Sequence, residues 1–241
     1  MVPIELVEHA KREEKMLISY SHKKFNSRFI LILSFALILF FQNISELSAL
    51  DINYVEINSG ILYLGNSDTN SAPSPILRTI GITLPLFQKN IFTIRSGINF
   101  WGNYYAYNGS RALPQEIEAP EDRWNWILAT NIDTRFGINY RFNKSIEAGA
   151  DTSLAFLLRF PIVSSEIAKN DKLSLLQYFF GKGRFFYPAN DLYFTWNVYN
   201  KLALSFNTKI MYPLFHLWDG ESLPFYDQLI LIGTIGFVIR F

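Results

Sequence analysis

The sequence predicts an all-β fold: an eight-stranded antiparallel up-and-down transmembrane β-barrel, preceded by a helical signal peptide. Three observations lead to this prediction. Apolar and polar residues alternate with a period of two along eight segments, as they do in strands with one apolar face. The links between these segments are alternately short and long. A 13-residue apolar run stands near the N-terminus.

The N-terminal segment has the three parts of a secretory signal peptide. Lys23, Lys24 and Arg28 form a positive region, and residues 29–41 form an apolar run in which Ser34 is the one polar residue. A polar stretch then leads to Ala49, a small residue suited to signal cleavage. The apolar run has 13 residues, too few for a membrane-spanning helix, which needs about 20.

The signal peptide divides the chain into two parts. We expect residues 1–49 to be the signal peptide and residues 50–241 to be the outer-membrane β-barrel domain. An uncleaved signal anchor and a buried helix are the alternatives for the first part. Residues 1–15 are charged and precede the usual start of such a signal, so we hypothesise that translation begins at Met16.

The clearest predicted strand covers residues 128–142. Ile132 and Phe136 belong to one face, and Asp133 and Arg135 belong to the other. A strand separates these two sets, whereas a helix does not. The other predicted strands are residues 51–65, 79–87, 90–100, 145–160, 192–199, 202–212 and 228–241.

The links between the strands arrange them as hairpins. The short links are residues 88–90, 143–144 and 200–201, and the long links are residues 66–74, 101–123, 161–191 and 213–227. Short turns at one end and long loops at the other are typical of transmembrane β-barrels.

The longest loop contains an apolar stretch, residues 171–188. We expect a small hairpin that turns at Gly181-Lys182-Gly183 and exposes apolar surface, which usually marks a contact site. The alternative is a segment that extends the wall or caps the mouth. If residues 173–187 formed two wall strands, the barrel would have ten strands.

The two faces of the strands differ in a way that favours lipid outside. The apolar face carries Phe, Leu, Ile and Trp and almost no charge apart from Arg78, and the other face carries small polar residues and a few charges. A soluble barrel would turn the apolar face inward. The charged residues predicted to face the lumen are Glu56, Arg95, Asp133, Arg135, Arg141, Glu147, Asp151, Arg159 and Lys209. Confined charges need partners, so we expect a plugged or narrow lumen and prefer structural salt bridges over a transport role.

The last strand ends in an alternating apolar pattern: Ile235, Phe237, Ile239 and a terminal Phe241. With this strand, the mature chain resembles the small eight-stranded outer-membrane proteins of diderm bacteria, the class of OmpW, OmpX and the OmpA barrel. The resemblance implies that the barrel-assembly machinery reads the last strand and that periplasmic chaperones escort a monomeric protein to the outer-membrane lipid. The implied localisation is the bacterial outer membrane.

Three functions are compatible with this class. The favoured one is an OmpW-like, narrow-lumen barrel that assists the passage of small hydrophobic molecules. The second is a surface-exposed adhesin, antigen or structural barrel, whose partners are host surface molecules bound by loops such as residues 109–123. The third is a lipid acyltransferase of the PagP type, for which His216, Asp219 and Ser222 lie in one loop.

Composition excludes several other classes. The chain has no cysteine and three histidines, which excludes a thiolate metal site and disfavours a histidine metal site. The formal net charge of +1 gives no signal for nucleic acid. We expect no cofactor, no metal, no nucleic-acid partner and no enzymatic activity.

Overall fold

The computed structural model describes residues 52–68, 74–116, 120 and 122–241. The predicted signal peptide, its cleavage after Ala49 and the start at Met16 lie outside these residues. Among the described residues, no helix is long and apolar enough to cross a membrane.

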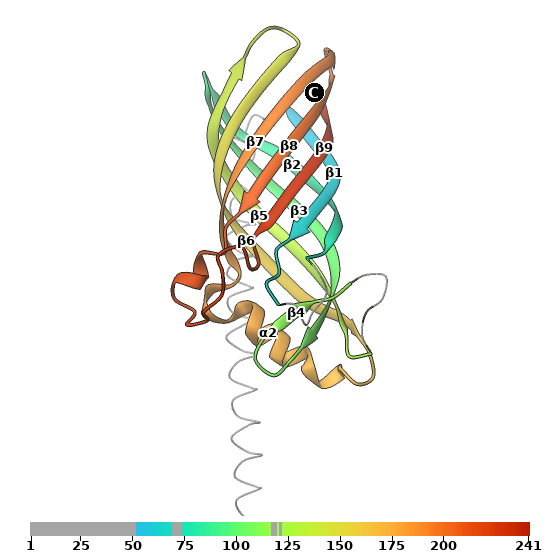
Figure 1. The fold of residues 1–241 in the computed structure, drawn as a ribbon. Coiled ribbons are helices and arrows are strands. Elements are labelled where there is room, and N and C mark those ends of the chain that lie inside the picture. The colour runs from blue at the N-terminus through green and yellow to red at the C-terminus, as the bar shows by residue number, and fades with distance from the viewer. Residues whose placement is uncertain (1–51, 69–73, 117–119, 121) are drawn as a thin grey trace, which may run out of the picture. The chain divides into compact units, whose positions relative to one another are not determined.

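Eight antiparallel strands close into a barrel wall (Figure 1). They are β1 Tyr54–Leu64, β2 Ile76–Lys89, β3 Phe92–Tyr107, β5 Asn125–Arg141, β6 Ile146–Ser164, β7 Phe186–Tyr199, β8 Leu202–Met211 and β9 Ile230–Arg240. A ninth short strand, β4 Ala112–Pro114, pairs with the end of β3. The wall closes because β9 pairs with β1 along its full length, from Arg240 opposite Tyr54 to Ile230 opposite Leu64. The predicted eight-stranded antiparallel barrel is confirmed.

Five wall strands extend further toward the long loops than the sequence pattern predicts. β2 begins at Ile76, β5 begins at Asn125 and β7 begins at Phe186, while β3 continues to Tyr107 and β6 continues to Ser164. These extensions lie toward the long loops, where the inward face also carries apolar residues such as the fully buried Tyr187. Because both faces are apolar there, the period-two pattern that predicts strands disappears.

The outward face of the wall is apolar and exposed. Side chains of Phe, Ile, Leu and Trp on this face are between 39% and 63% exposed: Ile57, Ile61, Ile80, Ile82, Leu154, Phe156, Leu192, Phe194, Trp196, Phe206, Ile235 and Phe237. The inward face holds buried charges such as Asp133 and Arg135. An apolar exterior around a charged interior is the reverse of a soluble domain and is the arrangement of a transmembrane barrel.

The interior has two halves. We call the end with the short links the turn end and the end with the long links the loop end. The half toward the turn end is polar and charged. The half toward the loop end is an apolar core lined by Leu62, Leu64, Leu77, Ile127, Leu157, Tyr187, Met211, Ile230 and Ile232.

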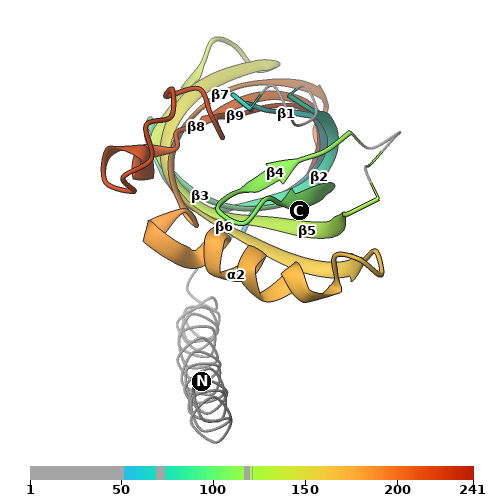
Figure 2. The same cartoon turned by 60° about the horizontal axis from the view of Figure 1, so that its bottom comes forward.

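Helical segments and β4 lie at the loop end (Figure 2). They are η2 Lys169–Asp171, α2 Lys172–Phe180, η3 Gly181–Gly183 and η4 Leu214–Leu217. Leu175 and Phe179 of α2 and Phe215 of η4 are fully buried in the apolar core. In Figure 2, α2 runs along the rim beside β6 and β4 projects across the ring.

The prediction for the loop at residues 171–188 was wrong in two respects. The first part is the helix α2 rather than a strand of a hairpin, which also excludes the ten-strand count. Its apolar residues are not simply exposed, because Leu175, Tyr178 and Phe179 are buried. Burial of these side chains over the barrel mouth stabilises the helix, as the alternative of a capping segment implies.

Candidate functional site

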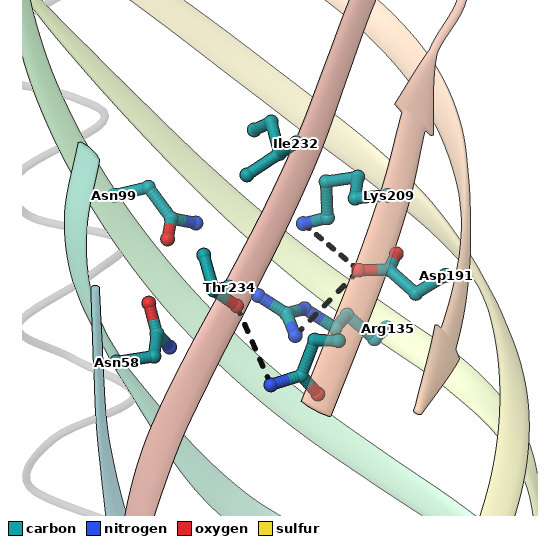
Figure 3. Close-up of a pocket in the computed structure, with 8 residues that line it drawn as sticks. Asn58, Asn99, Arg135, Asp191, Lys209, Ile232 and Thr234 are labelled. Atoms are coloured by element: carbon teal, nitrogen blue, oxygen red, sulfur yellow. Dashed lines mark hydrogen bonds and ion pairs between the residues drawn. The ribbon is translucent and has the colours of Figure 1, made fainter. Parts of the chain in front are cut away.

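An ion cluster of Asp133, Arg135, Asp191 and Lys209 crosses the lumen, and Figure 3 shows the last three of these side chains. The Nε of Arg135 donates to Oδ1 of Asp133 at 2.6 Å, and Lys209 pairs with the same carboxylate. Asp191 Oδ1 lies 3.3 Å from Lys209 Nζ and 3.6 Å from Arg135 Nη1. All four side chains are buried. Two cations and two anions cancel, so the cluster links β5, β7 and β8 without a net charge.

Further polar contacts fill the lumen toward the turn end. The Nε of Arg95 donates to Oδ2 of Asp151 at 3.0 Å. Glu56 accepts hydrogen bonds from Ser205 Oγ at 2.6 Å and from Asn207 Nδ2 at 2.7 Å. These predicted lumen residues are buried and lie against partners from other strands.

Glu147 pairs with two arginines at the turn end itself. Arg141 Nε donates to Glu147 Oε1 at 2.8 Å, and Arg240 Nη2 lies 3.7 Å from the same oxygen. The side chain of Arg141 is 62% exposed. Arg141 therefore lies at the rim rather than within the lumen as predicted, because β5 ends at this residue.

Arg159 differs from the other predicted lumen residues because it lies in the apolar half. Its guanidinium sits 4.3 Å from the centre of the Phe179 ring, and Nη2 donates to the backbone oxygen of Arg184 at 2.8 Å. Among the described residues, no carboxylate forms an ion pair with Arg159. A cation–π contact and a backbone acceptor thus hold this buried charge against α2 and the segment that follows it.

Glycines provide room for the charged side chains. A Cβ atom at Gly97 would lie 2.3 Å from Nη2 of Arg135, and one at Gly137 would lie 1.9 Å from Oδ1 of Asp151 and 2.3 Å from the backbone oxygen of Ala150. The narrow interior of an eight-stranded barrel requires such small residues where long side chains cross it.

The space left beside the ion cluster is small. A cavity of about 10 Å³ is lined by Asn58, Asn99, Arg135, Asp191, Asn207, Lys209, Ile232 and Thr234 (Figure 3). This volume is about what one water molecule needs. Paired charges therefore occupy the lumen at this level, and the cavity beside them has room for about one water molecule.

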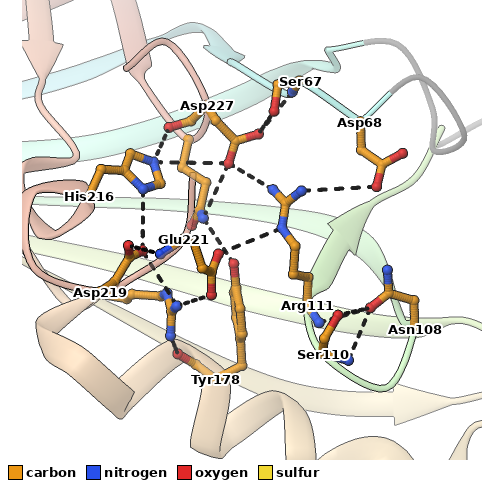
Figure 4. A network of polar contacts seen from close by, with 12 residues as sticks. Ser67, Asp68, Asn108, Ser110, Arg111, Tyr178, His216, Asp219, Glu221 and Asp227 are labelled. Atoms are coloured by element: carbon orange, nitrogen blue, oxygen red, sulfur yellow. Dashed lines mark hydrogen bonds and ion pairs between the residues drawn. The ribbon is translucent and has the colours of Figure 1, made fainter. Parts of the chain in front are cut away.

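The loop end is covered by a polar network that we call the outer cap (Figure 4). It consists of Ser67, Asp68, Arg111, Tyr178, Arg184, His216, Asp219, Glu221, Asp227 and Gln228. These residues come from all four long links between the wall strands.

Asp227 is the centre of the outer cap. Its Oδ1 accepts from the backbone N and the Oγ of Ser67 at 2.8 and 2.6 Å, and its Oδ2 accepts from Nη2 of Arg111 at 2.9 Å. Burial alone would lower the pKa of the Arg111 guanidinium, but the neighbouring Asp227 carboxylate raises it. One buried carboxylate thus ties the first and second long loops to the fourth.

Arg184 ties the third long loop to the fourth. Its Nη2 pairs with Glu221 and lies 3.5 Å from Oδ2 of Asp219. Its guanidinium lies 4.2 Å from the centre of the Tyr178 ring. Burial raises the pKa of the Tyr178 hydroxyl, which accepts a hydrogen bond from Nε2 of Gln228 at 3.1 Å.

The residues considered for an acyltransferase do not assemble into a triad. His216 Nδ1 lies 3.3 Å from Asp219 Oδ2, and its Nε2 lies 2.9 Å from the backbone oxygen of Asp227. Ser222 is exposed, and no hydrogen bond joins it to His216 in the described part of the chain. Both ring nitrogens of His216 already face oxygen atoms of the cap, so neither is directed at a nucleophile. In the same residues, no group of three or more His, Cys, Asp or Glu side chains is placed to hold a metal ion.

The predicted assembly strand is the last strand of the wall. Ile235, Phe237 and Ile239 point outward and are exposed, and Phe241 is the most exposed of the set. The backbone N of Phe241 donates to the backbone oxygen of Asn53 at 3.0 Å. This hydrogen bond extends the pairing of β9 with β1 to Phe241.

Sequence reasoning missed several polar residues that the structure brings together. Asp191 is the last residue of the predicted link 161–191, yet it lies within β7 and shares its inward orientation with Tyr193 and Thr195. Extending the alternation of β7 toward the N-terminus would have found it. No sequence pattern predicts the residues of the outer cap, because contacts between loops do not recur at a fixed spacing along the chain.

No family model and no curated protein matches the sequence. Among solved structures, Neisserial surface protein A is similar with a TM-score of 0.48 and 10% identity, over 78% of this chain and 96% of that chain. The outer membrane protein OprG from Pseudomonas aeruginosa is similar with a TM-score of 0.47 and 8% identity, over 79% and 97%. The outer membrane enzyme PagL gives a TM-score of 0.36 and 9% identity, over 78% and 99%. The description of this chain as a transmembrane β-barrel rests on its own closed sheet, apolar wall and charged interior.

Proposed function

We propose that this integral outer-membrane β-barrel protein works as a sealed barrel that presents an ordered loop surface outside the cell. The observation that carries the proposal is that two separate layers of side chains block the interior. A layer of paired charges fills one half and an apolar core covered by α2 fills the other. A solute on the barrel axis would have to disrupt both layers.

The outer cap supports a role in surface presentation. Ion pairs join described residues of all four long loops, so these residues form one connected surface. This surface exposes apolar side chains on the last loop: Leu217, Trp218, Phe225 and Tyr226. Exposed apolar groups on an ordered surface are typical of contact sites. The partners expected on this proposal are host surface molecules.

Exchange of the last loop tests this proposal. Residues 217–226 are replaced by a Gly/Ser linker of equal length, and binding of the purified protein to host extracellular-matrix components is compared with the unmodified protein. We expect binding to fall at least tenfold while the heat-modified gel shift of the folded barrel persists. Equal binding by both proteins would contradict a contact role for this loop.

A second candidate function is OmpW-like passage of small hydrophobic molecules. The apolar lining of the loop-side half favours it, because a hydrophobic molecule would find an apolar environment there. Phe179 and Phe215 fill that space, so α2 and η4 would have to move away first. The charged layer blocks the path to the turn end, so a solute would have to leave sideways through the wall.

Uptake measurements separate the two functions. Residues 173–183 are replaced by a Gly/Ser linker, and uptake of a hydrophobic fluorescent solute into vesicles that contain the barrel is followed. Transport predicts a change of several fold once the helix is absent. Unchanged uptake, at the level of protein-free vesicles, counts against transport and favours the sealed barrel.

A further inference from the structure

Helix α2 has three distinct sides. Leu175, Tyr178 and Phe179 are buried in the barrel mouth. Ser174 and Gln177 form a polar side. A third side, which we call the apolar stripe, consists of Leu173, Leu176 and Phe180 and is partly exposed. Spacings of three and four residues place these three side chains together on the helix surface.

The apolar stripe is continuous with the lipid-facing wall. Phe180 of the stripe lies 5.7 Å from the ring of Phe160, which faces outward on β6, and 6.4 Å from Phe185. Phe185 in turn stacks on the outward Phe156 at 6.4 Å. These ring contacts form an unbroken apolar surface from the wall onto the helix, so the medium that covers the wall reaches α2.

The length of β6 places this surface near the edge of the membrane. β6 has 19 residues, whereas about 9–11 tilted residues cross the hydrocarbon region. If the crossing starts at Ile146 at the turn end, it ends near Phe156 and places Phe160 at the level of the headgroups. An amphipathic helix at this level buries its apolar side at the boundary of headgroups and acyl chains.

A cation stands at the start of the same helix. Lys172 is the first residue of α2, and its Nζ donates to the backbone oxygen of Ile162 at 3.3 Å. Among the described residues, no carboxylate pairs with Lys172. The N-terminus of a helix disfavours a cation, but a lysine beside an apolar surface can extend its ammonium group to an anionic headgroup.

We propose that α2 is an interfacial helix that binds lipids of the outer leaflet. Its apolar stripe lies among the upper acyl chains, and Lys172 contacts anionic headgroups. The helix thus has a double role: one side closes the barrel and another side anchors the closed loop end to the membrane. This inference does not depend on the proposed surface function.

Spin labels test this arrangement directly. The chain has no cysteine, so single-cysteine variants need no background substitutions. Leu176→Cys in the apolar stripe, Ser174→Cys on the polar side and Leu154→Cys on the lipid-facing wall are labelled with a nitroxide. The barrels are reconstituted in vesicles of phosphatidylcholine and phosphatidylglycerol, and collision with oxygen is compared with collision with a water-soluble nickel chelate.

We expect the label at Leu176→Cys to resemble that at Leu154→Cys, with at least a threefold higher ratio of oxygen to nickel collisions than at Ser174→Cys. Equal ratios at positions 176 and 174, both typical of water, would overturn the proposal. Protection of position 176 from both reagents would also overturn it, because a protein partner or a second copy of this chain would then cover the stripe. Leu173→Cys repeats the measurement if Leu176→Cys fails to fold.

The headgroup contact has its own readout. In the Leu176→Cys background, Lys172→Gln is expected to lower the oxygen-to-nickel ratio about twofold in vesicles with phosphatidylglycerol and to leave it unchanged in pure phosphatidylcholine. An equal effect in both lipids, or no effect in either, would remove the anionic headgroup from the proposal.

Discussion

Asp133 holds two cations inside a barrel whose outer wall faces lipid. Its carboxylate accepts from Arg135 and Lys209 and also from Nδ2 of Asn131 at 2.9 Å. Asp133→Asn would leave these buried cations with Asp191 as the remaining anion of the cluster. We expect the free energy of unfolding to fall by about 3–5 kcal/mol, the usual cost of breaking a buried pair. Urea titration of the barrel in vesicles, followed by gel mobility, measures the change.

Glu166→Gln is the matched control for this prediction. Glu166 pairs with Lys169 on the surface, where both side chains are largely exposed. Such a pair contributes at most about 1 kcal/mol. Equal unfolding midpoints for Asp133→Asn and Glu166→Gln would show that the ion cluster does not stabilise the barrel.

Two glycines of the wall make a second comparison at the residue scale. A Cβ at Gly137 would lie 2.3 Å from the backbone oxygen of Ala150, whereas a Cβ at Gly233 meets nothing within 4 Å. Because a backbone atom cannot move aside easily, Gly137→Ala should lower the folded yield in vesicles severalfold. Gly233→Ala should leave it unchanged. The opposite order would contradict the close approach at Gly137.

The inward positions of single residues were largely predictable from the sequence. Strict alternation assigns Asp133, Arg135 and Lys209 to one face, because side chains of a strand alternate whatever the loops do. Asp191 was missed because the predicted strand began at Leu192, one residue after it. The pairing of these charges across the lumen depends on which strands face one another, and periodicity does not contain that information.

At the scale of elements, Asp227 connects loops that are distant in sequence. Asp227→Ala would release Ser67 of the first long loop and Arg111 of the second at once. We expect trypsin to cleave after Arg111 at least ten times faster, while the wall strands stay folded. Limited proteolysis of the reconstituted barrel with mass spectrometry reads this rate.

Asp122→Asn serves as the control for the proteolysis experiment. Asp122 also lies in the second long loop, but its carboxylate forms no ion pair among the described residues. The substitution should therefore leave the rate of cleavage after Arg111 unchanged. If Asp227→Ala also left that rate unchanged, the outer cap would not hold the loops together.

The wall strands were predictable as elements, but α2 was not. Strands with one apolar and one polar face carry a clear period. The segment from Leu173 to Phe180 is apolar at both helical and strand spacings, and no side chain caps the N-terminus of the helix. Because the segment has no N-terminal capping signal, its sequence does not predict a helix. It also does not predict that one side of this helix packs in the barrel mouth while another side adjoins the wall.

At the scale of the whole molecule, β9 closes the barrel by pairing with β1. Phe241 is 77% exposed and contributes its backbone hydrogen bond to Asn53 rather than buried side-chain area. If the last strand is the segment that the assembly machinery reads, Phe241→Ser should lower the amount of barrel in the outer membrane severalfold and leave the stability of the refolded protein nearly unchanged. Quantitative immunoblots of membrane fractions and urea titrations measure the two effects.

Phe142→Ser provides the comparison for Phe241. Phe142 is also an exposed aromatic residue at the turn end, but it lies in a hairpin rather than at the chain end. Its substitution should leave assembly intact. An equal loss of assembly for both variants would assign the effect to interfacial aromatic residues in general rather than to the terminal strand.

Conductance of the folded barrel in a planar lipid bilayer tests the sealed lumen most directly. The ion cluster and the apolar core block the interior in series, so we expect no discrete current steps for barrels whose folding is verified by their heat-modified gel mobility. A variant with residues 173–183 replaced by a Gly/Ser linker should stay silent as well, because the charged layer remains. Regular current steps from the unmodified barrel would contradict a closed interior.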